Sequence, residues 1–225
     1  MTFYNFVIPK FNLTISIQPK CGCSSIKSFV QTNGGHRINK KSIYNELKHF
    51  ENVLIVRDPY KRLISYYNLF VIEGNYRDLW IHVDAGKKIS LEKKSFKELI
   101  YIMKDMNEID YQHHLEPQTL GINLLHFNKI INIENFNNFI KKYTQFDCIK
   151  NRPAKSDYKN LMINRKPDEY NIISAHPNVG VDGKIWNIRK ACLYDNLYDK
   201  ELENIIKKYI YPQYYKKIQG NINIQ

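Results

Sequence analysis

Long apolar runs are missing from this chain of 225 residues. No window approaches the roughly 18 uninterrupted apolar residues that a membrane-crossing helix needs, so the sequence predicts no transmembrane segment. The residues around Lys10 are too polar for the apolar core of a signal peptide. With neither signal present, the default expectation is a cytoplasmic protein.

Cysteine is scarce, and its spacing excludes the common metal sites. The four cysteines form no C-x-x-C pair, and no set of Cys and His residues has the spacing of a zinc site. Cys21 and Cys23 flank a single glycine, which places them too close for an ordinary disulfide. We therefore expect reduced thiols and no bound metal.

Acidic residues are outnumbered by basic ones. The chain has 22 Asp and Glu residues against 34 Lys and Arg, which gives a formal net charge of +12. A basic protein attracts phosphates, sulfates, nucleic acid or anionic membranes. Because no nucleic-acid recognition motif is present, the charge favours an anionic cofactor, and it also suits an anionic acceptor.

Apolar strand patterns alternate with helical patterns, and hydrophobic residues make up 43% of the chain. This alternation predicts an α/β fold in which helices flank a parallel sheet. Ser24 or Ser25 is expected to cap the first helix, and Asn33-Gly34-Gly35 to end it. Residues 74–94 indicate an irregular insertion, and residues 150–190 match no element. Expected strands cover residues 3–8, 13–17, 52–56 and 128–133, and expected helices cover 24–31, 59–72, 95–106, 135–143 and 199–211.

The segment from Lys20 to Lys27 joins an apolar strand to the first helix. A strand–turn–helix of this kind aims backbone N–H groups and a helix N-terminus at one point, which is an anion site. Gly22 lets the backbone come close, Ser24 and Ser25 add hydroxyl donors, and Lys20 supplies a cation. The alternative is an ordinary strand–helix turn, which often contains Gly and Ser.

Arg57 directly follows the apolar run at 52–56, and Ser65 lies two turns into the next helix. The carboxyl end of a parallel strand is where open α/β sheets bind ligands, and a guanidinium group matches phosphate geometry. The alternative is a surface ion pair of Arg57 with Glu51 or Asp58. Two anion sites on two strand ends together indicate a ligand with two separate phosphate-like groups.

In this order, the two motifs resemble the signature of the sulfotransferases that use 3′-phosphoadenosine-5′-phosphosulfate (PAPS). Residues 110–118 are similar to the D-x-H-W-x-P-Q segment of the carbohydrate sulfotransferases, although Leu115 stands where Trp is usual. The strand before Glu134 and the Tyr-rich C-terminal helix also resemble the family, although Gln213 stands where Asp is common. The resemblance is weakest over 150–190. It implies a P-loop-like sulfotransferase fold of the Golgi family 2 type. The expectation of no membrane anchor is a departure from many members of that family.

The resemblance also implies roles for individual residues. The first motif would hold the 5′-phosphosulfate and the second the 3′-phosphate, while a basic residue late in the chain closes over the cofactor. Lys20 would also be catalytic, as the cation at the leaving oxygen, and no metal is required. The residues implied to bind PAPS are Lys20, Cys21, Gly22, Cys23, Ser24, Ser25, Arg57, Ser65 and Arg152.

An acceptor hydroxyl needs a base to take its proton, and histidine is suited to this role near neutral pH. In several relatives a histidine base lies about twenty residues before the 3′-phosphate arginine, and His36 occupies that place before Arg57. We expect its loop to emerge at the same sheet edge as both anion sites. The alternatives are His114, Glu73 and Glu116.

The sequence thus predicts one sulfotransferase domain over residues 1–225, which moves a sulfuryl group from PAPS to a hydroxyl, expected on a carbohydrate. A P-loop-like nucleotide kinase is one alternative, but the run Gly22–Ser28 lacks the second glycine of G-x-x-x-x-G-K-[ST]. A nucleic-acid-binding module and an inactive sulfotransferase fold that binds a partner are the others. The expected ligands are PAPS, its product 3′-phosphoadenosine-5′-phosphate (PAP), and the hydroxyl acceptor.

Overall fold

The chain divides into two compact units. The first unit comprises Met1–Asp58, Glu116–Asn151 and Gln213–Gln225, and the second comprises Pro59–Leu115 and Arg152–Pro212. The computed structural model describes residues 3–38, 47–67, 80–83, 87–91, 94–106, 114–118, 127–145, 178–179, 185–186 and 199–219.

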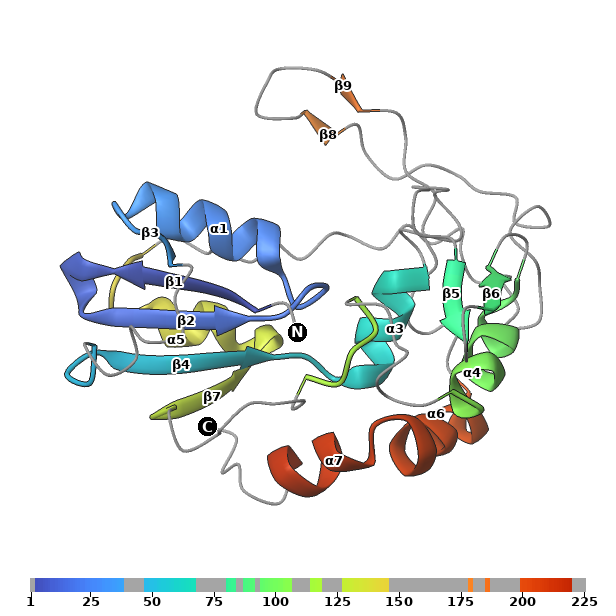
Figure 1. The fold of residues 1–225 in the computed structure, drawn as a ribbon. Helices are drawn as coiled ribbons and strands as arrows, with labels where there is room; N and C mark the ends of the chain where they lie inside the picture. The colour runs from blue at the N-terminus through green and yellow to red at the C-terminus, as the bar shows by residue number, and fades with distance from the viewer. Residues whose placement is uncertain are drawn as a thin grey trace. The chain divides into compact units, whose positions relative to one another are not determined.

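A mixed five-stranded sheet forms the centre of the first unit, in the order β3-β1-β2-β4-β7 (Figure 1). Strands β2, β4 and β7 run parallel, whereas β1 runs antiparallel to both β2 and β3. The α/β prediction is confirmed, and each of the four expected strands is present. The strands are β1 (Tyr4–Ile8), β2 (Leu13–Ile17), β3 (His36–Ile38), β4 (Glu51–Val56) and β7 (Lys129–Asn132).

The sheet departs from the expected parallel arrangement at β1 for a local reason. The short 3-10 turn η1 (Pro9–Phe11) and the left-handed Asn12, with φ of 49°, return the chain directly beside β1. A connection this short can join antiparallel neighbours only, since a parallel pair needs a long crossover. Helix α1 (Cys23–Thr32) then provides a longer connection before β3.

Helices α1 and α5 (Phe136–Ile140) pack on one face of this sheet. The rings of Phe29 and Phe136 meet edge to face, with 5.8 Å between their centroids. Alternate residues of β2 point into this core. The polar residues between them lie on the other face of the sheet, where their side chains form hydrogen bonds to the neighbouring strands. Ser16 Oγ donates to Asn5 Oδ1 over 2.8 Å, and Thr14 Oγ1 donates to Asn52 Oδ1. The short helix η5 (Ile133–Asn135) leads into α5.

The second unit is built around aromatic packing between α3 (Pro59–Tyr67) and α4 (Phe96–Lys104). The Phe96 ring lies 5.6 Å from the Tyr60 ring and 5.4 Å from the Tyr67 ring. The predicted capping box at α4 is confirmed, because the Ser95 and Glu98 side chains bond each other's backbone. This unit also contains β8 (Asn178–Val179), β9 (Ile185–Trp186), α6 (Lys200–Ile205) and the π-helix η9 (Ile206–Ile210). The chain passes into the first unit within α7 (Pro212–Tyr214), and the π-helix η10 (Tyr215–Gln219) belongs to the first unit.

One sequence prediction for the second unit, the irregular insertion at 74–94, needs correction. The stretch 74–94 is not wholly irregular, because β5 (Trp80–Val83) and β6 (Lys87–Ser90) pair as an antiparallel hairpin. The expected end of α3 near residue 72, and most of 150–190, lie outside the described residues. Within the part of the chain that the structure describes, no helix is long and apolar enough to cross a membrane.

Candidate functional site

The first candidate loop lies between β2 and α1 and contains two left-handed residues. Lys20 has φ of 68° and Gly22 has φ of 87°. The Gln18 carbonyl accepts hydrogen bonds from Cys21 N–H over 3.3 Å and from Cys23 Sγ over 3.0 Å. Because this turn is tight, α1 begins at Cys23, one residue earlier than the sequence predicts.

The predicted serine cap of α1 is wrong. The N-cap residue is Gly22, its carbonyl accepts the first helical bond from Ile26 over 3.1 Å, and no side chain among the described residues caps the helix. Ser24 and Ser25 lie within the first turn instead. The positive end of the helix dipole therefore begins directly at the loop, which is the arrangement that favours anions.

The second candidate loop begins at Arg57, directly after β4. Arg57 Nη1 donates a hydrogen bond to the Lys20 carbonyl over 3.1 Å, and Arg57 Nε lies 3.9 Å from Glu134 Oε1. Glu51, one of the partners considered from the sequence, lies at the other end of β4 and pairs with Lys129 over 3.1 Å. The two loops are therefore joined directly through the Arg57 guanidinium group.

A third segment, Glu116–Gln118, lies far from both loops in sequence and forms hydrogen bonds to both of them. The Gln118 side chain is buried, with its Oε1 2.8 Å from Arg57 N and its Nε2 2.7 Å from Arg57 O. The same Oε1 accepts from Cys21 Sγ over 3.1 Å. Gln18 Nε2 adds a bond to the Pro117 carbonyl over 3.2 Å. The sequence singled out this segment for His114 and missed Gln118, although the P-Q of the family segment marks it.

Most of the predicted cofactor residues share this part of the first unit. The Cys21 side chain is fully buried, so it anchors the loop from inside. Ser65 lies in α3 of the second unit, and Arg152 lies outside the described residues. The residues that the two loops bring together are Lys20, Cys21, Gly22, Cys23, Ser24, Ser25 and Arg57.

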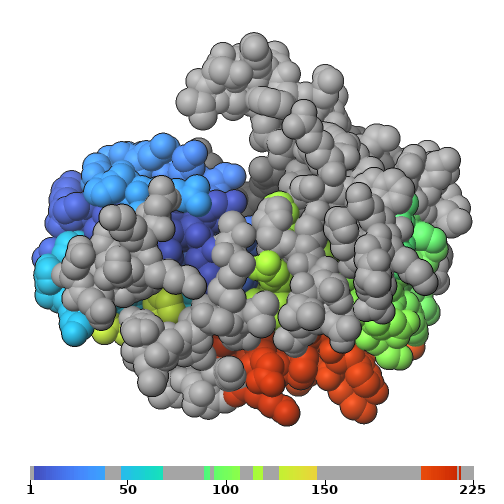
Figure 2. Space-filling view, viewed as in Figure 1, coloured from blue at the N-terminus to red at the C-terminus, as the bar shows by residue number. Residues whose placement is uncertain are grey.

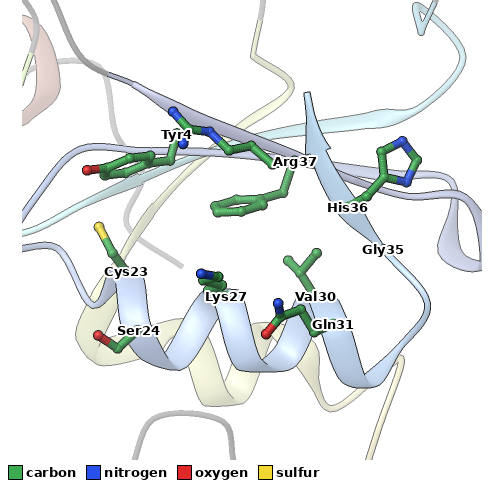
Figure 3. A pocket seen from close by; sticks show the side chains of 10 residues that line it. Tyr4, Cys23, Ser24, Lys27, Val30, Gln31, Gly35, His36 and Arg37 are labelled. Atoms are coloured by element: carbon green, nitrogen blue, oxygen red, sulfur yellow. The ribbon is translucent and has the colours of Figure 1, made fainter. Parts of the chain in front are cut away.

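The expected position of His36 is wrong. His36 begins β3 opposite Val7 of β1, and Val7 lies opposite Thr14 near the amino end of β2. Lys20 and Arg57, in contrast, follow the carboxyl ends of their strands. Because α1 runs back along the sheet before the Gly35 turn, the His36 position lies at the other end. Figure 3 shows its ring turned away from α1.

The other candidate bases are divided between the units. His114 belongs to the second unit, where the carbonyl of the neighbouring, fully buried Leu115 accepts a hydrogen bond from Tyr211 Oη. Glu116 belongs to the first unit, and Glu73 lies outside the described residues. In the described ranges, no group of three or more His, Cys, Asp or Glu side chains could hold a metal ion.

A groove of about 440 Å³ lies along α1, between the helix and strands β1 and β3 (Figure 3). Cys23 and Ser24 line one end of it, next to the first loop. Lys27 lines its floor, and the Arg37 guanidinium group lies 4.8 Å above the Tyr4 ring. Since the described residues of its lining include cations and aromatic rings but no carboxylate, the groove suits an anionic ligand with apolar faces.

Adjoining loops of this kind, at the carboxyl ends of parallel strands, are typical of α/β proteins that bind phosphate esters. A family model described as "Sulfotransferase family" matches residues 6–151, which include both loops and the 114–118 segment. The chain therefore belongs to the sulfotransferase family, of the carbohydrate and Golgi type, whose members use PAPS. Comparisons with curated proteins and with solved structures found no significant match.

Proposed function

We propose that this protein transfers a sulfuryl group from PAPS to a hydroxyl group of a carbohydrate. Family membership supports the reaction, and the hydrogen bond of 3.1 Å between Arg57 Nη1 and the Lys20 carbonyl supports the site. PAPS carries a phosphosulfate and a 3′-phosphate on one adenosine. Two joined anion loops can hold both groups of such a molecule.

In the proposed mechanism, the acceptor oxygen forms a bond to sulfur while the bond from sulfur to the 5′-phosphate oxygen breaks. The acceptor proton passes to a base, and negative charge grows on the leaving phosphate of PAP. Lys20 and the N-terminus of α1 would stabilise that charge. Arg57 and Ser65 would hold the 3′-phosphate, and Arg152 would add a cation. These groups supply the positive field, so the proposal requires no metal.

His36 and His114 are the two proposed bases. His36 lines the groove beside α1, but the strand register places it toward the amino end of β2, at the end of the groove away from the first loop. This position weakens the case for His36. His114 precedes the segment whose Gln118 bonds Arg57 by four residues. We therefore favour His114 and keep His36 as the alternative.

The groove beside α1 supports an acceptor with negative charge. It begins at Cys23 and Ser24, next to the loop proposed for the phosphosulfate, and it presents Lys27 and Arg37 along its length. A sugar ring has apolar faces that can lie against Tyr4, while a carboxylate or sulfate group could pair with the cations. An acidic carbohydrate is therefore the proposed acceptor class.

Two measurements with PAP, adenosine 5′-phosphosulfate and ATP test this function: calorimetric titration gives each Kd, and thermal unfolding at equal ligand concentration gives the stabilisation of the fold. PAP should bind most tightly and should stabilise the fold by about 2.7 kcal/mol at a hundredfold excess over its Kd. Adenosine 5′-phosphosulfate lacks the 3′-phosphate and should stabilise the fold much less. A preference for ATP would indicate a kinase, and equal stabilisation by PAP and adenosine 5′-phosphosulfate would remove the role proposed for Arg57 and Ser65.

A further inference from the structure

The Gln118 side chain makes an unusual pairing with the backbone of one residue. Its Oε1 accepts from Arg57 N–H over 2.8 Å, and its Nε2 donates to the Arg57 carbonyl over 2.7 Å. This is the pattern that a neighbouring strand would offer to Arg57. The Gln118 amide thus extends the backbone pairing of β4 by one residue, at the point where the strand leaves the sheet.

The same amide also holds the first loop. Cys21 Sγ, which is fully buried, donates to Gln118 Oε1 over 3.1 Å. Arg57 closes the connection, because its Nη1 donates to the carbonyl of Lys20, the residue before Cys21. One buried side chain, 3% exposed, therefore contacts both loops, and a rotation of its amide would disturb both.

We infer that Gln118 is a positioning residue that fixes Arg57 for the 3′-phosphate of the cofactor. The inference rests on the proposed function, in which Arg57 holds that phosphate. Gln118 contacts the Arg57 backbone, while the guanidinium group extends to the Lys20 carbonyl. With the backbone fixed at one end and the guanidinium group at the other, Arg57 is preorganised, which reduces the ordering cost of binding.

The chemistry of the contacts explains why an amide is needed at this position. Arg57 presents one donor and one acceptor, and only a side chain that carries both can satisfy them together. A glutamate would place a second acceptor against the Arg57 carbonyl, and a methionine would leave both backbone groups without this partner. Both variants have about the volume of glutamine, so both test the hydrogen bonds rather than the space.

The experiment compares PAP with adenosine 5′-monophosphate (AMP), which differs from PAP only in lacking the 3′-phosphate. The ratio of the Kd for AMP to the Kd for PAP measures the contribution of that phosphate. In Gln118→Met and Gln118→Glu the ratio should fall by about tenfold, the scale of a lost buried hydrogen-bond pair. A purely structural role would reduce the fraction of folded sites without changing this ratio.

Asn52→Leu is the matched control. Asn52 is another buried amide on the same strand, it joins β4 to β2 through Thr14, and it lies near the opposite end from Arg57. Its loss should lower the melting temperature and leave the Kd ratio unchanged. A double variant with Arg57→Ala should show no further fall in the ratio beyond that of Arg57→Ala alone.

The outcomes separate this inference from the proposed function. If Arg57→Ala leaves the ratio unchanged, the role of Arg57 in the proposed function is wrong. If Arg57→Ala lowers the ratio while both folded Gln118 variants keep it, the positioning role of Gln118 is overturned. If Gln118→Met does not fold, Gln118→Glu decides together with its double variant with Arg57→Ala. A fall in the ratio that persists without the Arg57 side chain would come from the charge of the added carboxylate and would overturn the positioning role.

Discussion

Lys20 has a left-handed backbone, with φ of 68°, although it carries a full side chain. That conformation costs roughly 1–2 kcal/mol for a residue other than glycine. The strain accompanies a contact, because the Lys20 carbonyl accepts a hydrogen bond from Arg57. At the scale of single residues, the backbone of Lys20 thus connects the two loops, while the role proposed for Lys20 in the chemistry belongs to its side chain.

Lys20→Ala should lower turnover by about 10²–10³-fold, while PAP affinity falls less, because the cation acts most as charge moves onto the leaving oxygen. Lys20→Gly should lose turnover to the same degree, although glycine accepts the left-handed backbone without strain. Steady-state kinetics and PAP titration measure both effects. Lys104→Ala, at an exposed position in the last turn of α4, is the control. Near-normal turnover in both Lys20 variants would contradict the assignment.

The base can be identified by comparing two histidine variants. His114→Ala should lose about 10²–10⁴-fold in turnover while PAP still binds, because a general base contributes on that scale. Its pH–rate profile should also lose the acid limb, since a protonated imidazole accepts no proton. His36→Ala should keep most of its turnover. The reverse result would restore His36 as the base and would contradict the argument from strand register.

At the scale of elements, the return from α1 to β3 depends on one glycine. A Cβ atom added at Gly35 would lie 2.6 Å from the Val7 carbonyl oxygen and 2.7 Å from Val30 Cγ1. Neither the β1 backbone nor the buried Val30 can move away easily. The helix can therefore pack this closely on the sheet only with glycine at this position.

Gly35→Ala should destabilise the protein by about 1–3 kcal/mol, the range found for overpacked sites. Gly34→Ala is its neighbour control, because a Cβ there meets no atom within 4 Å and the variant pays only for a φ of +72°. Denaturant unfolding of both variants measures the difference. An equal or smaller loss for Gly35→Ala than for Gly34→Ala would show that the close packing has no energetic consequence.

Glu51, at the amino end of β4, contacts Lys129 of β7 and two residues that follow α5, Lys142 and Tyr143. Burial alone would raise the pKa of the Glu51 carboxyl, but hydrogen bonds from Lys142, Tyr143 and Lys129 outweigh it and lower this pKa below its usual 4.5. A lowered pKa means that the folded state favours the charged form. The resulting stability is present above the usual carboxyl pKa and is lost as pH falls through the folded value.

Glu51→Gln should therefore cost about 1 kcal/mol near neutral pH, since the side chain is partly exposed and the bonds are charge-assisted. The difference in unfolding free energy between wild type and variant should shrink as pH falls below 4.5. Urea unfolding at several pH values measures this difference. A gap that stays constant down to acid pH would contradict the lowered pKa of Glu51.

The elements were more predictable from the sequence than their arrangement. Strands β2 and β4 are short β-branched runs, and the Ser95 capping box is a local signal, so both are encoded by neighbouring residues. The direction of β1, in contrast, depends on how the short turn at Pro9–Phe11 folds. The serine cap was mispredicted because the left-handed turn at Lys20 and Gly22 starts α1 early.

For the candidate site, too, the local motifs were predictable from the sequence and the long-range contacts were not. The loops at Lys20 and Arg57 follow from motifs a few residues long. Their link through Gln118 joins positions that lie 61 and 97 residues apart in the chain, so the P-Q of its segment marks the residue but not its partners. The spacing of His36 and Arg57 in the sequence predicts that they lie close together. In the structure α1 carries the chain to the other end of β2, so His36 lies away from Arg57.

At the scale of the whole molecule, the net charge of +12 agrees with membership of a family that uses a polyanionic cofactor. The match over residues 6–151 covers both loops and the sheet strands from the third residue of β1 onward. It does not specify the acceptor, because acceptor-binding loops vary most within a fold. The charge and the groove beside α1 are the features of this chain that favour an acidic carbohydrate.

The most direct test of the account is a transfer assay with radiolabelled PAPS over a panel of acidic glycans, neutral glycans, tyrosine peptides and small alcohols. The account predicts label on an acidic glycan, formation of an equal amount of PAP, and loss of both in Lys20→Ala. Transfer to peptides or alcohols alone would contradict the proposed acceptor class. Binding of PAP without transfer to any acceptor would contradict the central claim that this protein is an active sulfotransferase.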